Sequence, residues 1–419
     1  MMNEGFDLAN RRPDDEQGPE IVSCPDCFAE EPERPIPDLP VHQPENVFAI
    51  DLGGAYSRIA RLDRAGLPEV IADPWTESIP SAILFECEDG VYVGEDAAEL
   101  KYFEPQRVFS RWKEWLGCEH DPHAPVYEAF GRRYTPAELT TILLKKIAIY
   151  AEDSTGDPVR NVVISCPAWF DFRQRRLLAE AGKAAGLNVL DVISDPIAAA
   201  LCYSTVMTEG KKRVMVLDLG DSFDAAVLDV SREDESIACK KIAIYGDDAL
   251  GCPDWDEVLY RLLLWKYCEE WGYAEDSVAA DLRLEIRMKT EDIRKKLSVR
   301  EKVSCLFHSE AERTRLDVTR AEFEEATQYL VDRMIARVDS MLENAGLTDA
   351  DIDKVLLVGG GVKMPMVHNA FTGRFGEKAR LFEPEFSVVK GAAIYGNAMH
   401  SYQLPENAPP SGPKDGIIV

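Results

Sequence analysis

A short apolar strand that runs directly into an Asp-Leu-Gly turn occurs twice in this sequence. The first copy is 47–50 followed by Asp51, Leu52 and Gly53, and the second is 214–217 followed by 218–220. Each turn is followed by a run that alternates like a strand, at 58–62 and 225–230. A supersecondary unit that occurs twice indicates an internal duplication. The sequence therefore predicts two similar lobes, each with a glycine turn and an aspartate beside it.

Apolar strands and helices alternate between the two ends of the chain. Residues 355–358 form a third apolar run, which ends in the glycines 359–361. A helix is expected to begin at Pro136 with Thr135 as its cap, because proline suits the first helical turn and threonine the capping position. Helical spacing also covers 173–185 and 320–345. Buried strands bounded by glycines and separated by helices are typical of an α/β fold.

The charge balance excludes several classes of partner. The chain has 75 acidic and 47 basic side chains, which gives a net charge of −28. Nucleic-acid binding needs a basic surface, and anionic membranes repel an acidic one. No apolar run reaches the ~20 residues that span a bilayer, and the first residues do not resemble a signal peptide. We therefore expect a cytoplasmic protein without nucleic-acid or membrane partners.

The two ends differ in composition from the rest of the chain. Residues 1–45 are rich in proline and acidic side chains and predict a disordered acidic leader, while 403–419 read as a linker-like tail. The ten cysteines are scattered, which is typical of free thiols in a reducing compartment. Cys24 and Cys27 have the spacing of a metal or redox pair, but no second pair lies near them, so their role stays open.

The glycine turns predict a phosphate site. A glycine turn lets backbone N–H groups converge on phosphate oxygens, but an aspartate beside it would repel them. A hard cation between the aspartate and the phosphates would remove this repulsion, and Mg²⁺ typically binds one or two carboxylates plus phosphate oxygens. Asp51 and Asp218 would hold this ion, and the glycines 359–361 would allow a ring or sugar to approach closely. No Gly-x-x-x-x-Gly-Lys-Ser/Thr motif exists, so a P-loop enzyme is excluded.

A charged helical segment offers a second nucleotide contact. Glu291, Arg294, Lys295 and Ser298 recur at spacings that share one helix face. Long cationic stems can sandwich a purine, while the carboxylate and the hydroxyl bond its edge or the ribose. The alternative, a solvated charged helix, stays open on this segment alone.

Taken in order, these motifs resemble the nucleotide-binding domain of the 70-kDa heat-shock chaperones, within the actin-like ATPase superfamily. The resemblance runs from 47 to 399 and includes the first phosphate loop 50–57, the segment 113–117, Cys166-Pro-Ala-Trp-Phe170 and the connecting motif 194–200. It continues through 246–256, the helix 291–298 and the adenosine motif 358–365. It implies an actin-like ATPase fold, with two duplicated ribonuclease-H-like lobes and a nucleotide cleft between them. Lobe I would comprise 46–210, completed by 386–402, and lobe II 211–385.

The resemblance also assigns roles to residues that bind ATP or ADP and Mg²⁺. Lys113, Asp195 and Asp218 would be catalytic, and Asp51 and Asp218 would hold the metal. The nucleotide-binding set would be Gly53, Gly54, Ala55, Tyr56, Gly220, Asp221, Ser222, Gly251, Glu291, Arg294, Lys295, Ser298, Gly359, Gly360, Gly361, Lys363 and Glu385.

Three departures from the family pattern all touch the phosphates. Gly54 and Ala55 stand where two threonines are usual, Asp221 and Ser222 replace a Gly-Gly-Thr stretch one residue longer, and Asp195 replaces a glutamate. Lost hydroxyl donors weaken stabilisation of developing charge, and ~1 Å of misplacement can cost ~100-fold in rate. We therefore expect slow ATP hydrolysis, with a non-hydrolysing, nucleotide-gated binding module as the alternative.

The resemblance implies partners as well. A J-domain co-chaperone would bind near Arg175, and a nucleotide exchange factor would be a second partner. Either a peptide-binding domain follows residue 419, or the protein is a stand-alone ATPase-type domain. The apolar end of the tail resembles the linker that joins such domains. A filament-forming actin relative and a small-molecule kinase are further alternatives, which the adenine helix disfavours.

Overall fold

The computed structural model describes residues 47–403, apart from 72–76, 88–89, 102–103, 105–106, 119–120, 234–235 and 309–312. The predicted acidic leader, the Cys24 and Cys27 pair and the tail from 404 onward lie outside the described residues. The described chain forms two compact units. The smaller unit comprises Pro253–Arg333 and Met364–Met366, and the larger contains Met334–Lys363 with all described residues before 253 and after 366.

The first sheet of the larger unit is built around β1 (Val47–Leu52). Its strand order is β11-β10-β1-β2-β3, with β4 also paired to β2. β1 runs parallel to β10 and antiparallel to β2. The other strands are β2 (Tyr56–Leu62), β3 (Pro68–Val70), β4 (Ile79–Pro80), β10 (Asn161–Cys166) and β11 (Asn188–Ser194). β1 is buried along its whole length, as its continuous apolar run predicts.

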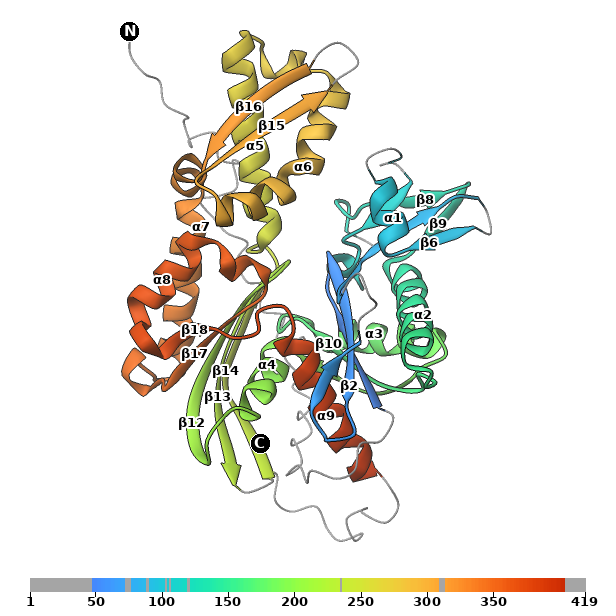
Figure 1. Cartoon of the computed structure of the whole chain (residues 1–419), viewed down its shortest axis with the longest axis vertical. Coiled ribbons are helices and arrows are strands. Elements are labelled where there is room, and N and C mark those ends of the chain that lie inside the picture. The colour runs from blue at the N-terminus through green and yellow to red at the C-terminus, as the bar shows by residue number, and fades with distance from the viewer. Residues whose placement is uncertain are drawn as a thin grey trace. The chain divides into compact units, whose positions relative to one another are not determined.

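The second sheet repeats this arrangement around β12 (Gly210–Leu219). Its order is β14-β13-β12-β17-β18, and β12 again runs parallel to one neighbour, β17, and antiparallel to the other, β13 (Figure 1). The remaining strands are β13 (Phe223–Glu233), β14 (Ser236–Asp247), β17 (Lys354–Val358) and β18 (Ala379–Leu381). Both sheets share one strand order and one pattern of directions. The internal duplication predicted from the two turns is therefore confirmed, and the exact lobe boundaries stay a prediction.

Two apolar helices cross between these sheets. α4 (Asp195–Ser204) packs on β12 and β13, and α9 (Ser387–Gln403) packs on β1 and β2. The helices also contact each other, and their buried side chains form one core with both sheets. At the crossing, Gly391 lies so close to Ala198 that an added Cβ would overlap the Ala198 carbonyl. The close approach of α4 and α9 therefore requires glycine at this position.

The helix crossing yields a stability prediction. Gly391→Ala should lower the free energy of unfolding by about 1–3 kcal/mol, because the backbone must move apart to accept the methyl group. Gly373→Ala is the matched control, since Gly373 lies in α8 (Pro365–Phe375) with no atom within 4 Å of the added Cβ. The control should be neutral or stabilising. Urea unfolding followed by circular dichroism measures both, and equal effects would contradict the close crossing.

Smaller elements complete the larger unit. α2 (Pro136–Thr155) begins as predicted, with a capping box between Thr135 and Glu138, and α3 (Phe172–Ala184) begins at Asp171 with a second capping box. The other elements are β5 (Ala82–Phe85), β6 (Val91–Val93), α1 (Glu95–Leu100), β7 (Val108–Ser110), η1 (Lys113–Trp115), β8 (Tyr127–Ala129), β9 (Arg132–Tyr134), η3 (Asp349–Asp351), η4 (Gly360–Lys363) and η5 (Gly376–Lys378).

The smaller unit consists of helices beside a two-stranded sheet. β15 (Lys302–His308) and β16 (Arg313–Thr319) pair antiparallel, and α6 (Ala280–Val299) packs on β15 (Figure 1). α5 (Cys252–Trp271) starts at the end of the larger unit, and α7 (Arg320–Asn344) passes from the smaller unit into the larger one. η2 (Glu275–Ser277) connects α5 with α6.

Within the described ranges, no helix combines the length and apolar composition needed to cross a bilayer. The cysteines of this part of the chain are free thiols, as expected.

Candidate functional site

Asp51 lies at the carboxyl end of β1, where the parallel strands of the first sheet end together. Its neighbour across β10 is Ser165, whose hydroxyl donates to Asp51 Oδ1 at 3.1 Å. Its neighbour across β2 is Arg58, whose Nη1 lies 3.4 Å from Asp51 Oδ2. Asp195 follows the end of β11 at the same edge. Ligands bind at the carboxyl ends of the strands in open α/β sheets, so this edge has the position of a binding site.

Asp218 occupies the corresponding place in the second sheet. It lies beside Val358 of β17 and directly opposite Asp224 of β13. Gly359 follows β17 with φ +81° and presses so close that an added Cβ would overlap Asp218 Oδ1 and the Leu219 carbonyl. A residue other than glycine is therefore excluded there by backbone angle and by space. The structure thus joins the third glycine turn to the second Asp-Leu-Gly turn.

Lys113 supplies a buried positive charge to this site. It opens η1 with only 7% of its surface exposed, and its Nζ donates to the Leu52 carbonyl beside Asp51. The ammonium also lies 5.7 Å from the centre of the Phe170 ring. A lysine this deeply buried needs a charged partner, and the acidic side chains around it fill that need.

The acidic side chains are close enough to change one another's protonation. Burial raises the pKa of Asp195 to about 6, with Lys113 opposing this shift and Asp51 adding to it. Burial also raises the pKa of Asp218 well above its usual value, and the charges of Asp195, Asp224 and Asp51 raise it further. The aspartates of the two turns therefore share one electrostatic environment.

A hydrated cation fits these residues. Oδ1 of Asp195 is buried and has no hydrogen-bond partner among the described residues. Burial and the charge of Asp51 also disfavour the ionised form of Asp195, and a bound cation would favour that form. The described residues contain no group of three or more acidic, histidine or cysteine side chains arranged to ligate a metal directly. Mg²⁺ keeps several of its waters and needs few direct protein ligands, so Asp51 and Asp218 would hold it largely through water.

Asp224 belongs to this cluster, although the sequence analysis did not select it. Its Oδ1 accepts from the Ala168 N–H at 2.8 Å, its Oδ2 lies 3.0 Å from Ser222 Oγ, and burial raises its pKa to about 7. The signal was available, because a tight hairpin after Asp218 places the residue six positions later directly across the sheet. In the first lobe, seven positions separate Asp51 from its cross-strand neighbour Arg58.

The raised pKa of Asp224 predicts a pH effect on stability. A carboxyl group whose pKa is raised by folding favours the native state at low pH, and this contribution is lost as pH rises through the folded value. The side chain of Asp224→Asn stays neutral at every pH. Between pH 5 and pH 8 the free energy of unfolding of this variant should therefore rise by about 2 kcal/mol relative to that of the wild type. Urea unfolding in EDTA at several pH values measures this. Parallel pH profiles of the two proteins would contradict it.

The two phosphate loops meet through a carboxylate. Oδ2 of Asp221 accepts from the backbone N–H of Gly54 at 2.8 Å and of Ala55 at 3.2 Å. Oδ1 of Asp221 lies 3.2 Å from Nη1 of Arg111, a residue that the sequence analysis did not select and whose backbone has φ +57°. The resemblance assigns Asp221 to the nucleotide-binding set. Its carboxylate accepts hydrogen bonds from two backbone N–H groups of the first loop, which were predicted to bind phosphate.

Backbone contacts surround three more of the predicted nucleotide-binding glycines, Gly53, Gly251 and Gly220. A Cβ on Gly53 would overlap the carbonyl of Tyr56, and one on Gly251 would overlap that of Asp221. The Gly220 N–H donates to the Ser222 carbonyl at 3.0 Å, which closes the second turn. The first turn is thus fixed within its own loop, and the second is also held by Gly251.

Lys363 and Glu385 form an ion pair of 2.6 Å. Lys363 ends η4, directly after the glycine turn, so the pair lies in the larger unit with the phosphate loops.

The predicted adenine helix is α6 of the smaller unit. Arg294 is buried and binds both carboxylate oxygens of Asp256, at 2.7 and 3.2 Å. Lys295 lies 2.8 Å from Glu291, and the Ser298 hydroxyl donates to the Arg294 carbonyl at 3.1 Å. The two cations therefore differ, since Lys295 is half exposed while Arg294 is held inside the unit. The adenine contacts of all four predicted residues stay a prediction.

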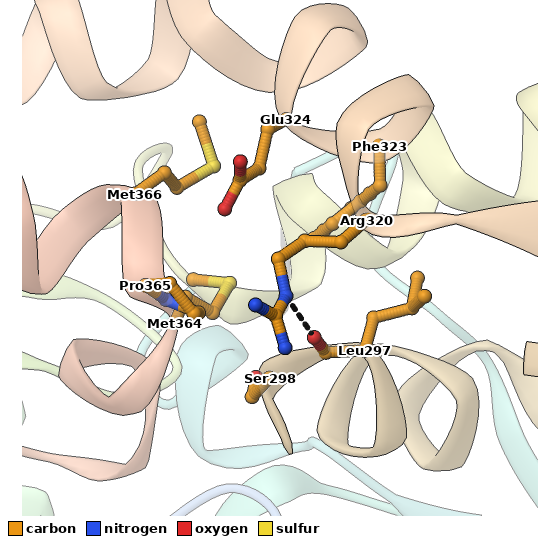
Figure 2. A pocket seen from close by; sticks show the side chains of 8 residues that line it. All are labelled: Leu297, Ser298, Arg320, Phe323, Glu324, Met364, Pro365 and Met366. Carbon is orange, nitrogen blue, oxygen red and sulfur yellow. Dashed lines mark hydrogen bonds between the residues drawn. The ribbon is translucent and has the colours of Figure 1, made fainter. Parts of the chain in front are cut away.

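A small hollow lies at the carboxyl end of α6, as Figure 2 shows. Ser298 borders it together with Met364 and Pro365, so the end of the predicted adenosine motif meets the predicted adenine helix within one unit. Arg320 closes one side, and its Nε donates to the Leu297 carbonyl at 2.8 Å. The hollow is lined by Leu297, Ser298, Arg320, Phe323, Glu324, Met364, Pro365 and Met366.

The structure thus gathers the two Asp-Leu-Gly turns, Lys113, Asp195 and the glycine turn 359–361 in one unit, while the residues of α6 belong to the other. A comparison with protein families finds a match. The model of the family described as Hsp70 protein matches residues 47–404.

Proposed function

Since the chain belongs to the Hsp70 family, whose domains bind ATP or ADP with Mg²⁺, we propose that it is a nucleotide switch that hydrolyses ATP slowly. Family membership makes it a chaperone-type ATP-binding domain with an actin-like ATPase fold. The observation that carries hydrolysis at this site is the shared environment of Asp51, Asp195, Asp218 and Lys113, built from both duplicated sheets.

Each residue of the site has a role in hydrolysis that follows from its chemistry. Bound Mg²⁺ would neutralise charge on the phosphates. Asp51 and Asp218 would hold the hydrated ion, while Lys113 would stabilise charge that develops on the transferred phosphoryl group. Asp195, with a pKa of about 6, is largely ionised at neutral pH and would accept a hydrogen bond from the attacking water. Backbone N–H groups at 53–56 and 220–222 would bind phosphate oxygens, and 359–361 the sugar or base.

Slow turnover follows from the reach of Asp195. An aspartate carboxylate ends about one methylene short of a glutamate, and its Oδ1 has no protein partner in the described part of the chain. Asp195→Glu should therefore accelerate phosphate release by at least about tenfold, whereas Asp195→Asn should slow it by a similar factor. Single-turnover release of radiolabelled phosphate from a preformed Mg·ATP complex measures both. Equal rates for all three proteins would remove Asp195 from the mechanism.

A second candidate function is a binding module that clamps ATP without cleaving it. The observation that favours it is the Asp221 carboxylate on the N–H groups of Gly54 and Ala55. The same single-turnover experiment separates the candidates. Phosphate release within minutes supports the slow ATPase, and bound ATP that stays intact for hours supports the module.

Partners follow from the family rather than from contacts. A J-domain co-chaperone near Arg175, an exchange factor, a peptide-binding domain after residue 419 and a cytoplasmic location complete the proposal. Arg175 gives the first of these a physical basis, because its Nη2 donates to Ser194 Oγ at 2.8 Å, next to Asp195. A partner that binds Arg175 and breaks its hydrogen bond to Ser194 would disturb the end of β11, which Asp195 directly follows.

A further inference from the structure

The carboxylate of Asp221 is bound as an anion would be at a phosphate loop. Two adjacent backbone N–H groups, of Gly54 and Ala55, converge on Oδ2 at 2.8 and 3.2 Å, and the Arg111 guanidinium lies 3.2 Å from Oδ1. Backbone N–H groups in a tight turn, backed by a guanidinium, form the usual donor set for phosphate oxygens. An internal carboxylate therefore occupies a set of donors that suits a phosphate.

The position of Asp221 is fixed from both sides. Gly251 packs against the Asp221 carbonyl so closely that no side chain fits there, and the Gly220 N–H closes the turn on Ser222. The Asp221 side chain is 24% exposed and that of Arg111 30%, so water screens the contact only in part. The second loop thus directs this carboxylate toward the first loop.

The glycine at position 54 makes the contact possible. A Cβ on Gly54 would lie 2.9 Å from Oδ2 and 3.1 Å from Cγ of Asp221, which is too close for an unmoved carboxylate. A threonine at this position, the residue expected from the family pattern, would displace Asp221. The changes in the first and second loops therefore form one structural feature, in which a missing side chain on one loop accommodates an added acid on the other.

From this geometry we infer that Asp221 is an internal competitor for the nucleotide phosphates and latches the two loops together when no nucleotide is bound. The inference rests on the proposed function, because the competing ligand is Mg·ATP. Nucleotide phosphates must displace the carboxylate before they reach Gly54 and Ala55. Asp221 therefore lowers the affinity for phosphates and leaves the affinity for the nucleoside part unchanged.

The test compares a ligand with phosphates and one without. Mg·ATP and adenosine are titrated calorimetrically into the wild type, Asp221→Ala and Gly54→Ala. Asp221→Ala removes the carboxylate, and Gly54→Ala pushes it away with a methyl group while all charges remain. Both variants should bind Mg·ATP about tenfold more tightly, the scale of a lost charge-assisted hydrogen bond, and adenosine as the wild type does. Thermal unfolding of each variant checks that it is folded.

Amide hydrogen exchange tests the latch without any ligand. The N–H groups of Gly54 and Ala55 should exchange slowly in the nucleotide-free wild type and at least about tenfold faster in Asp221→Ala. Equal exchange in the two proteins would overturn the latch.

The binding outcomes separate this inference from the proposed function. If all proteins bind Mg·ATP with one affinity, or Asp221→Ala binds it more weakly, the inference is wrong and the ATP site stands. If no protein binds Mg·ATP or adenosine, both the inference and the proposed function fail.

Discussion

Replacing Lys113 by methionine should reduce single-turnover phosphate release by at least about 100-fold. The ammonium is buried beside Leu52, and its charge opposes the raised pKa values of both Asp195 and Asp218. A preorganised donor of this kind contributes about 10²–10³ to the rate when developing charge is stabilised. The variant should also melt earlier at pH 8, because the acids around position 113 would lose their compensating charge.

The control for this prediction is Lys146→Met. Lys146 lies exposed on α2, so the same change there should alter neither phosphate release nor melting. A Lys113→Met protein that releases phosphate at the wild-type rate would show that this lysine has no catalytic role, whatever its effect on melting.

Arg294→Met should destabilise the protein by about 3–5 kcal/mol. The guanidinium is bound by both oxygens of Asp256, and both side chains are largely buried. Removing one partner leaves an uncompensated charge inside the smaller unit, whose cost is of this size. Adding Asp256→Leu to the variant should recover much of the loss, because a buried ion pair is often no better than a well-packed apolar pair.

Lys295→Met is the matched control on the same helix. The Lys295 side chain, which pairs with Glu291, is half exposed. Its replacement should therefore lower the free energy of unfolding by less than about 1 kcal/mol. Chemical unfolding of the single variants and the double variant gives the three values. A loss for Arg294→Met as small as that for Lys295→Met would contradict a structural role for Arg294.

The fold was predictable where local patterns carry the information. Thr135 and Pro136 fix the start of α2 through capping and proline geometry, and α3 and α7 lie within one residue of their predicted limits. The duplicated Asp-Leu-Gly turns predicted the repeated sheet because an apolar strand that ends in a glycine turn has few other placements. Asp51 and Asp218 consequently take corresponding positions.

The parts that sequence reasoning missed depend on contacts between distant segments. Asp221 meets Gly54 across 167 residues, and Asp256 meets Arg294 across 38, so no local pattern reveals either partner. Helix spacing predicted that Arg294 and Lys295 lie near one helix face, but it does not tell which of them turns inward. The raised pKa values of Asp195 and Asp224 likewise depend on burial that only the folded chain creates.

The most direct test of the central claim, that an aspartate from each duplicated turn holds Mg²⁺ on the phosphates, is a calorimetric titration with ATP in Mg²⁺ and in EDTA. The wild type should bind ATP at least about tenfold more tightly with Mg²⁺, and Asp51→Asn and Asp218→Asn should each remove that gain. Equal ATP affinity in Mg²⁺ and EDTA, or no binding in either, would contradict the claim.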